Sequence, residues 1–167
     1  MAGMVISQVA EEIADKLERL VYLSAYLPEN GQSLFSLIAV NRDNVGEAPI
    51  EKLMSVSTNT ATCSIPDQSI QELFYNCSPL ALIPEHFPEQ AALPFSGKVS
   101  LSEERFGRVK KTYICCLDDQ VIPISHQRHM LKKQACHEMV QLDSDHSPFV
   151  SCPDLLGSIL CSVSLPD

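Results

Sequence analysis

The sequence has few basic residues, no long apolar run and no basic leader. Lysine and arginine number 12 against 21 aspartates and glutamates, which gives a formal net charge of −9. Proteins that bind duplex nucleic acid neutralise phosphates with lysine and arginine, so this balance argues against that class. No apolar segment approaches the ~20 residues that cross a bilayer, and residues 1–10 lack the basic flank of a signal peptide. We therefore expect no nucleic-acid partner and no membrane partner.

Close cysteine pairs are also absent. The seven cysteines are spread along the chain without a Cys-x-x-Cys pair of the kind that binds zinc. The nearest metal-ligand candidates are His126 with His129 and Cys136 with His137, and neither pair provides a full ligand set. We expect reduced thiols in a cytoplasmic protein, with no metal and no other cofactor.

The length of 167 residues suits a single domain, because domains usually span ~100–200 residues. Apolar residues recur at helical spacing over Ala2 to Ala14 and almost without a break over Leu20 to Leu27. The first pattern predicts an amphipathic helix. The second predicts a strand that is buried on both faces, as strands of parallel sheets are. Ser33 is placed to cap a helix over 34–40.

The regular pattern returns after Gly107. It predicts strands over Lys110 to Leu117 and Glu138 to Leu142, and helices over 125–134 and from Pro153 to about 162. Such an alternation of strands and helices indicates an α/β fold, with about three parallel strands and flanking helices.

Prolines interrupt the stretch between these two regions and leave one clear helical segment, 68–76. We expect residues 41–97 to form an inserted, mainly helical cap or lid. Residues 1–40 and 98–167 then form the α/β core.

Two strand ends carry side chains that could work together. Asp119 follows the strand that ends at Leu117, and His146 follows the strand that ends at Leu142. In open parallel sheets, sites form beyond the carboxyl ends of the strands. A carboxylate that holds one ring nitrogen of a histidine supports general-base catalysis. The alternatives are that the two side chains never meet, or that Asp118 takes the place of Asp119.

A nucleophile for such a site is missing. None of the six glycines begins the Gly-x-Ser-x-Gly turn that places a serine at a strand–helix elbow. Ser147 and Ser151 lie near His146 in the sequence, but no pattern places them on an exposed elbow. The sequence therefore has two members of a possible triad and lacks the third.

Several blocks of the sequence resemble a known family. The blocks are Leu20 to Ser33 (LVYLSAYLPENGQS), Leu73 to Pro79 (LFYNCSP), Ser102 to Gly107 (SEERFG), Lys110 to Pro123 (KKTYICCLDDQVIP), His126 to Leu131 (HQRHML) and Asp145-His146. They are similar to the carboxyl-terminal part of the plant methyl esterase and hydroxynitrile lyase branch of the α/β-hydrolases and of its bacterial relatives. The resemblance covers nearly the whole chain and implies an incomplete α/β-hydrolase fold.

The resemblance also assigns roles. Asp119 matches the triad aspartate of the family and His146 its triad histidine. Met1 matches the residue directly after the nucleophile serine, whose backbone N–H belongs to the oxyanion hole. By this resemblance the chain begins one residue past the nucleophile, and we expect it to be inactive or nearly so as written.

The resemblance favours ester hydrolysis over lyase chemistry. Hydroxynitrile lyases of this branch usually carry a lysine after the triad histidine, and this chain has Ser147 there. The expected substrate is a small hydrophobic ester. The apolar side chains of the cap either bind its acyl group or pack the cap: Leu34, Phe35, Leu73, Phe74, Leu80 and Leu82.

A non-catalytic protein is the alternative from another class. In the family, the segment that matches Leu20 to Leu27 pairs with the nucleophile strand. Without that strand, 20–27 would present an apolar edge, which favours self-association. The two hypotheses are therefore a carboxylic (methyl) ester hydrolase in an incomplete chain, and a truncated remnant that acts by association.

Overall fold

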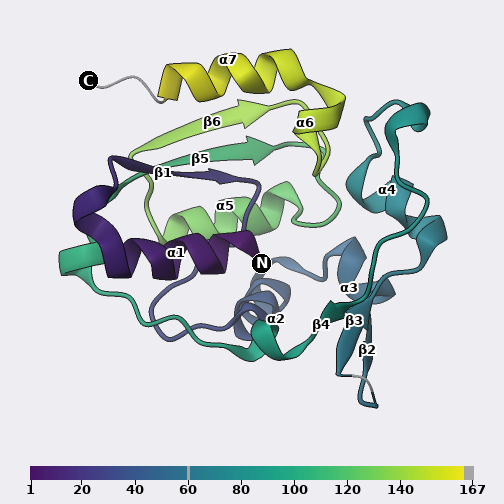
Figure 1. Cartoon of the computed structure of the whole chain (residues 1–167), viewed down its shortest axis with the longest axis horizontal. Helices are drawn as coiled ribbons and strands as arrows, with labels where there is room; N and C mark the ends of the chain where they lie inside the picture. Colours follow the sequence, from purple (N-terminus) through teal and green to yellow (C-terminus); the bar gives the residue numbers. More distant parts are fainter. Residues whose placement is uncertain (60, 164–167) are drawn as a thin grey trace.

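The computed structural model describes residues 1–59 and 61–163. A parallel sheet with strand order β1-β5-β6 forms its centre (Figure 1). The strands are β1 (Arg19–Leu23), β5 (Lys110–Cys116) and β6 (Glu138–Leu142). The sequence-based prediction of an α/β fold with three parallel strands and flanking helices is therefore confirmed.

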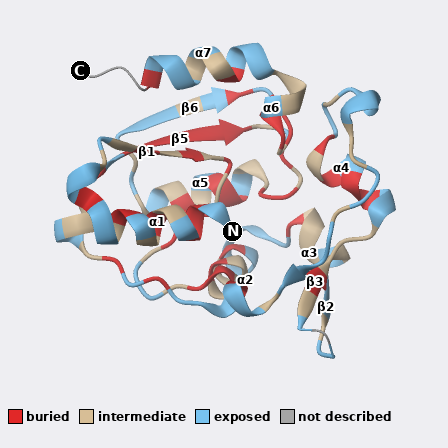
Figure 2. Ribbon diagram, in the orientation of Figure 1, coloured by how far each residue is buried: buried red, intermediate tan, exposed pale blue. Residues whose placement is uncertain are grey.

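Helices cover both faces of this sheet. Helices α1 (Ala2–Ile13) and α5 (Ile124–Lys133) lie on one face, and α7 (Pro153–Val163) lies on the other (Figure 1). Successive side chains of a strand point to opposite faces. Tyr22 and Tyr113 accordingly pack in the larger core, and Ile114 packs with Leu142 in the smaller one under α7. The central strand β5 is almost wholly buried (Figure 2).

Strand β1 ends earlier than the apolar run predicts. Ser24 has φ 35°, a left-handed conformation that ends the extended backbone. The remaining residues of the run, 25–27, form a loop: the Tyr113 hydroxyl donates to Ala25 O at 2.7 Å, and Leu27 is buried. The predicted strand 20–27 is therefore wrong beyond Leu23, because burial alone does not distinguish a strand from a buried loop.

The helices begin and end for local reasons. Ser33 caps α2 (Leu34–Val45) as predicted, since its side chain accepts the Ser36 N–H and Ser36 Oγ accepts the Ser33 N–H. This helix continues five residues past the predicted end, to Val45, and Gly46 follows it with φ 94°. A 3₁₀ turn, η1 (Ala14–Lys16), follows α1, and the short α6 (Pro148–Ser151) precedes α7. No helix of the described residues is long and apolar enough to cross a membrane.

The elements of 41–97 lie beside one end of the central sheet (Figure 1). They include α3 (Pro49–Leu53) and α4 (Ile70–Phe74), with 3₁₀ turns at η2 (Asp67–Ser69), η3 (Leu80–Leu82) and η4 (Leu93–Ser96). A small antiparallel sheet joins β2 (Ser55–Ser57), β3 (Thr62–Ser64) and β4 (Gln90–Ala91). The sequence analysis missed this sheet, because strands of two or three residues are too short to show an alternating pattern.

A turn of π-helix, η5 (Glu103–Gly107), leads from this region back to β5.

Candidate active site

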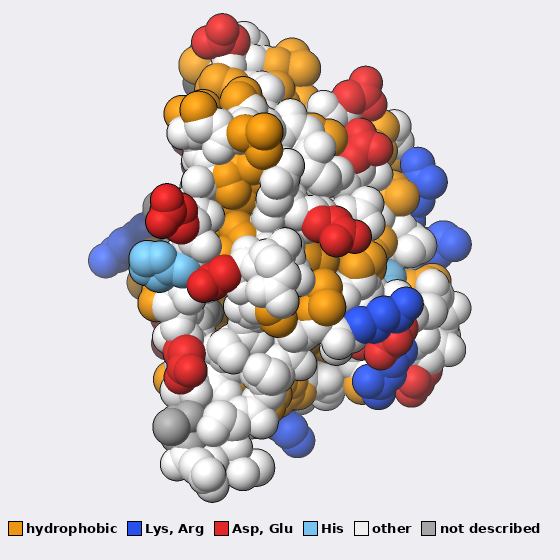
Figure 3. Space-filling model, turned by 90° about the vertical axis from the view of Figure 1, so that its right-hand side faces the viewer, with side chains coloured by type: hydrophobic (Ala, Val, Ile, Leu, Met, Phe, Trp, Pro, Cys, Tyr) orange, Lys and Arg blue, Asp and Glu red, His pale blue; other side chains and the backbone are white. Residues whose placement is uncertain are grey.

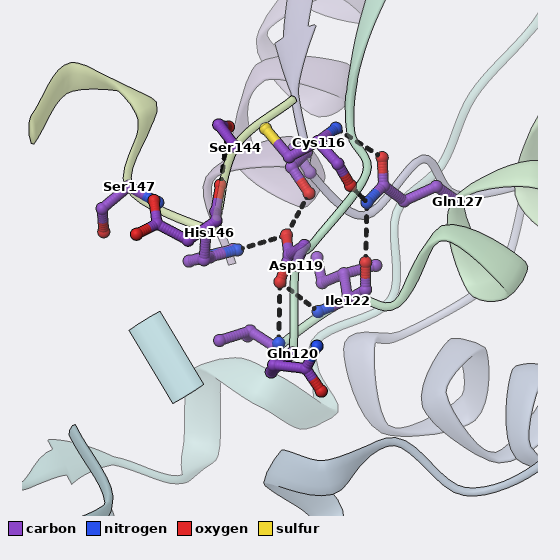
Figure 4. A network of polar contacts seen from close by, with 12 residues as sticks. Cys116, Asp119, Gln120, Ile122, Gln127, Ser144, His146 and Ser147 are labelled. Carbon is purple, nitrogen blue, oxygen red and sulfur yellow. Dashed lines mark hydrogen bonds and ion pairs between the residues drawn. The ribbon is translucent and has the colours of Figure 1, made fainter. Parts of the chain in front are cut away.

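Asp119 lies in the turn that follows β5 and is only 2% exposed. Its Oδ1 accepts the N–H groups of Val121 at 2.7 Å and Ile122 at 2.9 Å. Its Oδ2 lies 2.7 Å from Nδ1 of His146 (Figure 4). The neighbouring Asp118 is exposed and has no such contact. Of the two aspartates, Asp119 is therefore the one that holds the histidine.

Ser24, the residue directly after β1, also contacts the Asp119 carboxylate. The hydroxyl of Ser24 donates to Asp119 Oδ2, the oxygen that also faces His146. Ser24 is buried. The two residues are separated by 95 positions in the sequence, so the sequence analysis had no signal for this contact.

Gln127 fixes the turn from the side of α5. Its Nε2 donates to the carbonyls of Cys116 at 2.9 Å and Ile122 at 2.7 Å, and its Oε1 accepts the Cys116 N–H at 3.2 Å (Figure 4). A buried amide that satisfies both ends of a turn restricts it strongly. The sequence analysis missed Gln127 as well, because one polar residue in a helix carries no pattern.

The loop after β6 brings His146 to the same place. Backbone bonds from Leu117 N to Leu142 O and from Asp118 N to Ser144 O, both 3.0 Å, join the two loops. The Nε2 atom of His146 has no hydrogen-bond partner within the described residues, and the ring contacts Phe74 edge to face at 5.5 Å between centroids. A histidine held at Nδ1 and open at Nε2 can act as a general base.

Asp145 anchors this loop to the cap. Its fully buried carboxylate accepts the Ser147 N–H at 2.9 Å and Ser151 Oγ at 3.0 Å through Oδ1. Through Oδ2 it accepts the Cys77 N–H at 2.9 Å and Ser78 Oγ at 2.7 Å. Ser151 therefore donates to Asp145, and no hydrogen bond joins it to His146 among the described residues.

A cavity of about 240 Å³ adjoins His146. Its lining is mostly apolar and includes Met1, Leu34, Ile38, Phe74 and Phe95. Met1 and His146 thus line the same space.

Only part of the predicted acyl-binding set lines this cavity. Leu34 and Phe74 do, whereas Leu80 and Leu82 are 70% and 61% exposed. Leu73 is buried in the core, and Phe35 packs edge to face on Phe95 at 5.6 Å. For Phe35 and Leu73 the alternative of packing therefore applies. Leu80 and Leu82 do neither, because an apolar residue in an irregular segment has no periodicity that indicates its direction.

The two residue pairs considered as metal ligands, His126 with His129 and Cys136 with His137, form no cluster of three ligands in the described residues. His126 Nε2 contacts Gly46 O at 2.7 Å, and His137 Nδ1 accepts the Lys111 N–H at 3.2 Å. Within residues 1–59 and 61–163, no group of three potential metal ligands occurs. The seven cysteines are free thiols, and burial raises the pKa of Cys116 to about 12 and that of Cys136 to about 11.

A carboxylate after one parallel strand, a histidine after the next and an inserted cap together define a class. Their chain order, carboxylate before histidine, is the order in which the α/β-hydrolase fold carries the second and third members of its triad. The chain has the α/β-hydrolase fold.

Comparisons with known proteins agree with this class. No family model matches the chain. It is 31% identical over 170 residues to putative methylesterase 11, chloroplastic, of Arabidopsis thaliana. The aligned region covers 97% of this chain and 44% of that protein. It is 28% identical to a pyrethroid hydrolase of Sphingobium wenxiniae, over 96% of this chain and 59% of that protein.

Solved structures show the same likeness. A crystal structure of a pyrethroid hydrolase from Sphingobium faniae is 26% identical, with a TM-score of 0.84, over 96% of this chain and 66% of that one. The chain spans 44% and 38% of the length of the first two curated relatives it matches. It is therefore an α/β-hydrolase-fold protein whose relatives are plant methylesterases and a bacterial pyrethroid hydrolase, as its sequence blocks indicate.

Proposed function

We propose that this chain provides the acid–base half of a carboxylic ester hydrolase. The observation that carries the proposal is the 2.7 Å contact between buried Asp119 Oδ2 and His146 Nδ1, beside an apolar cavity. The names of its relatives, methylesterase and pyrethroid hydrolase, support hydrolysis of an ester. The expected substrate is a small hydrophobic ester, with a methyl ester as one candidate.

In the proposed reaction His146 transfers one proton in each of two half-reactions. Its Nε2 takes the proton of a serine hydroxyl while that oxygen attacks the ester carbonyl, and then gives the proton to the departing alcohol. Asp119 holds the ring in the required tautomer and stabilises its cation. A water molecule then repeats both steps on the acyl-enzyme and releases the acid.

We further propose that residues 1–167 do not themselves contain the serine. His146 has one hydrogen bond to a described side chain, and that bond goes to Asp119. Met1 lines the cavity beside His146, which supports its proposed place next to a nucleophile. Without a nucleophile the acyl-enzyme route is closed, so we expect the 167-residue chain to hydrolyse p-nitrophenyl butyrate at nearly the rate of buffer.

A chimera tests the proposed function directly. Residues 2–163 would replace the matching part of the Sphingobium wenxiniae pyrethroid hydrolase, which supplies the rest of the fold. We expect the chimera to hydrolyse p-nitrophenyl butyrate, and His146→Ala and Asp119→Asn each to lower kcat by about 10³- to 10⁴-fold. The matched control is His86→Ala, since His86 is exposed and its loss should change little.

Two results would contradict the proposal. A chimera with a native circular dichroism spectrum and no activity would do so, as would full activity in His146→Ala. If the 167-residue chain itself is active and His146→Ala abolishes that activity, the proposed absence of a nucleophile is wrong.

Self-association is a second candidate function with its own observation. Among the described residues β1 pairs with β5 only, so its other edge is open. Val5 and Val9 of α1 are 54% and 44% exposed at helical spacing, and apolar side chains also reach the surface on the cap side of the molecule (Figure 3). An open strand edge beside exposed apolar groups favours pairing with a second copy.

Light scattering after size exclusion measures this association. We expect the 167-residue chain to form dimers or larger species, and the Val5→Lys and Val9→Lys double variant to shift toward monomer. A wild-type monomer across the micromolar range would contradict it.

The cytoplasmic location and the absence of cofactor, membrane and nucleic-acid partners stay predictions. The seven free thiols and the net charge of −9 support them. Several plant relatives carry the word chloroplastic in their names, so fractionation of the native cells is the direct measurement.

A further inference from the structure

Two polar side chains stand out in the apolar cavity beside His146. Tyr26 and Glu51 both line it, from the loop after β1 and from α3. Tyr26 is only 6% exposed, and the side chain of Glu51 is also 6% exposed. Groups of this kind are normally hydrogen-bonded when buried, so a missing partner needs an explanation.

Glu51 uses only one of its two oxygens for local structure. Its Oε1 accepts the Ala48 N–H at 3.0 Å and thereby caps α3. Its Oε2 is buried without a hydrogen-bond partner in the described residues. The nearest cation, Arg42, lies 3.8 Å away through Nη1, beyond hydrogen-bond distance, and its own side chain is half exposed. One carboxylate oxygen is therefore left to accept a hydrogen bond.

Tyr26 supplies the complementary group. Its hydroxyl makes no hydrogen bond to any described residue. Burial raises the pKa of Tyr26, and the charges of Glu51 and Asp119 raise it further. The hydroxyl therefore stays protonated at neutral pH and can donate, and it lines the same cavity as Glu51.

We propose that Tyr26 and Glu51 recognise a hydroxyl group on the acyl part of the ester. One neutral hydroxyl can accept from Tyr26 and donate to Glu51 Oε2 at once, while its apolar body packs on the cavity wall. A group that only accepts, such as a methyl ether, leaves the Glu51 oxygen buried and unpaired, which disfavours binding. This inference rests on the proposed function in that the cavity takes the acyl group.

Binding to the 167-residue chain tests the proposal without any turnover. The probes are methyl 3-hydroxybenzoate and methyl 4-hydroxybenzoate, compared with methyl benzoate and methyl 4-methoxybenzoate, titrated by NMR chemical shift. We expect at least one hydroxyl isomer to bind about tenfold more tightly than both comparison esters, because one hydrogen bond to a charged acceptor has about that effect.

Isosteric variants identify the residues. Tyr26→Phe and Glu51→Gln should each reduce the preference for the hydroxyl ester to threefold or less. The matched controls Tyr75→Phe and Glu72→Gln should keep it, since neither residue lines the cavity. Glu51→Gln retains an oxygen for the Ala48 N–H, and circular dichroism checks that every variant folds.

Equal affinity for all four esters in the wild-type chain would overturn the proposal, and so would an unchanged preference in both variants. These outcomes are separate from failure of the proposed function. An inactive chimera together with a hydroxyl preference would refute ester hydrolysis and keep the binding site. An active chimera without the hydroxyl preference would support ester hydrolysis and refute the binding site.

Discussion

Asp119 accepts hydrogen bonds from four groups that belong to three different parts of the chain. Two are N–H groups of its own turn, at Val121 and Ile122, and the others come from Ser24 and His146. The turn donors hold Oδ1, which leaves Oδ2 directed at the histidine. A buried carboxylate with its lone pairs used in this way has little freedom to rotate. The orientation of His146 therefore depends on donors from the end of β1 and from the turn after β5.

We expect different substitutions of Ser24 to lower the stability of the protein by different amounts. Ser24→Ala removes the donor to Asp119 and keeps a side chain at φ 35°. We expect it to lower the free energy of unfolding by about 1.5–3 kcal/mol, as for a lost hydrogen bond to a charged group. Ser24→Gly loses the same bond but relieves the left-handed backbone, so its loss should be about 1 kcal/mol smaller. Urea unfolding measures both, and a larger loss for glycine would contradict this account.

At the scale of elements, α1 is fixed to the core at both of its ends. Its first turn lies against the loop after β1, where a Cβ on Gly3 would stand 1.9 Å from Tyr26 O. Its last turn is tied to 102–106, because the Glu11 carboxylate accepts the Ser102 and Phe106 N–H groups at 2.8 and 3.1 Å. The helix thus fastens the segment before β5 and the loop that carries Tyr26.

Gly3→Ala tests the close approach between the first turn of α1 and the backbone of Tyr26. The methyl group would overlap a backbone carbonyl, so the helix has to move, and we expect a loss of at least about 2 kcal/mol in the free energy of unfolding. The control is Gly157→Ala in α7, where nothing lies within 4 Å of the added methyl group. That change should raise stability by up to ~1 kcal/mol through helix propensity. Equal effects of the two substitutions would show that the contact with Tyr26 is not restrictive.

Glu11 makes the attachment of the last turn of α1 sensitive to pH. Burial by itself raises the pKa of this carboxyl, but hydrogen bonds from Ser102 and Phe106 and the charge of Arg105 outweigh it, so the net shift is downward. A lowered folded-state pKa stabilises the protein above the ordinary carboxyl pKa, and this contribution is lost as pH falls through the folded pKa. We expect Glu11→Gln to be less stable than wild type at pH 7 and the gap to close below about pH 4.

Urea unfolding at several pH values measures that gap. Glu12→Gln serves as the control because Glu12 is exposed and one position away. A gap that stays constant from pH 7 to pH 3 would mean that the charge of Glu11 contributes nothing.

For the whole molecule, Asp145 links the cap to the sheet. Donors from 147 and 151 on the core side and from 77 and 78 on the cap side meet at one buried carboxylate. His146 is the next residue, so the position of the cap and that of the proposed general base are coupled through one side chain.

Asp145→Ala should therefore loosen two regions together. Leaving these donors without an acceptor is expected to cost about 3 kcal/mol, and hydrogen exchange should rise both in 70–83 and in 143–151. Ser151→Ala removes a single donor and should affect the core side only, by about 1 kcal/mol. Exchange that rises in one region alone after Asp145→Ala would refute the coupling.

The sequence by itself determined the α/β class, the three strands and the capping of α2, since these follow from local periodicity and side-chain type. It also indicated Asp119 and His146, because each directly follows a strand whose end could be located. Only the tertiary structure decided that Asp119, and not Asp118, faces His146. It also decided that Ser24 donates to this carboxylate and that Gln127 holds the backbone of its turn. It alone placed Tyr26 and Glu51 in one cavity and moved Leu80 and Leu82 out to the surface. The physical reason is that these contacts join residues far apart in the chain or in irregular segments, where side-chain direction has no sequence period.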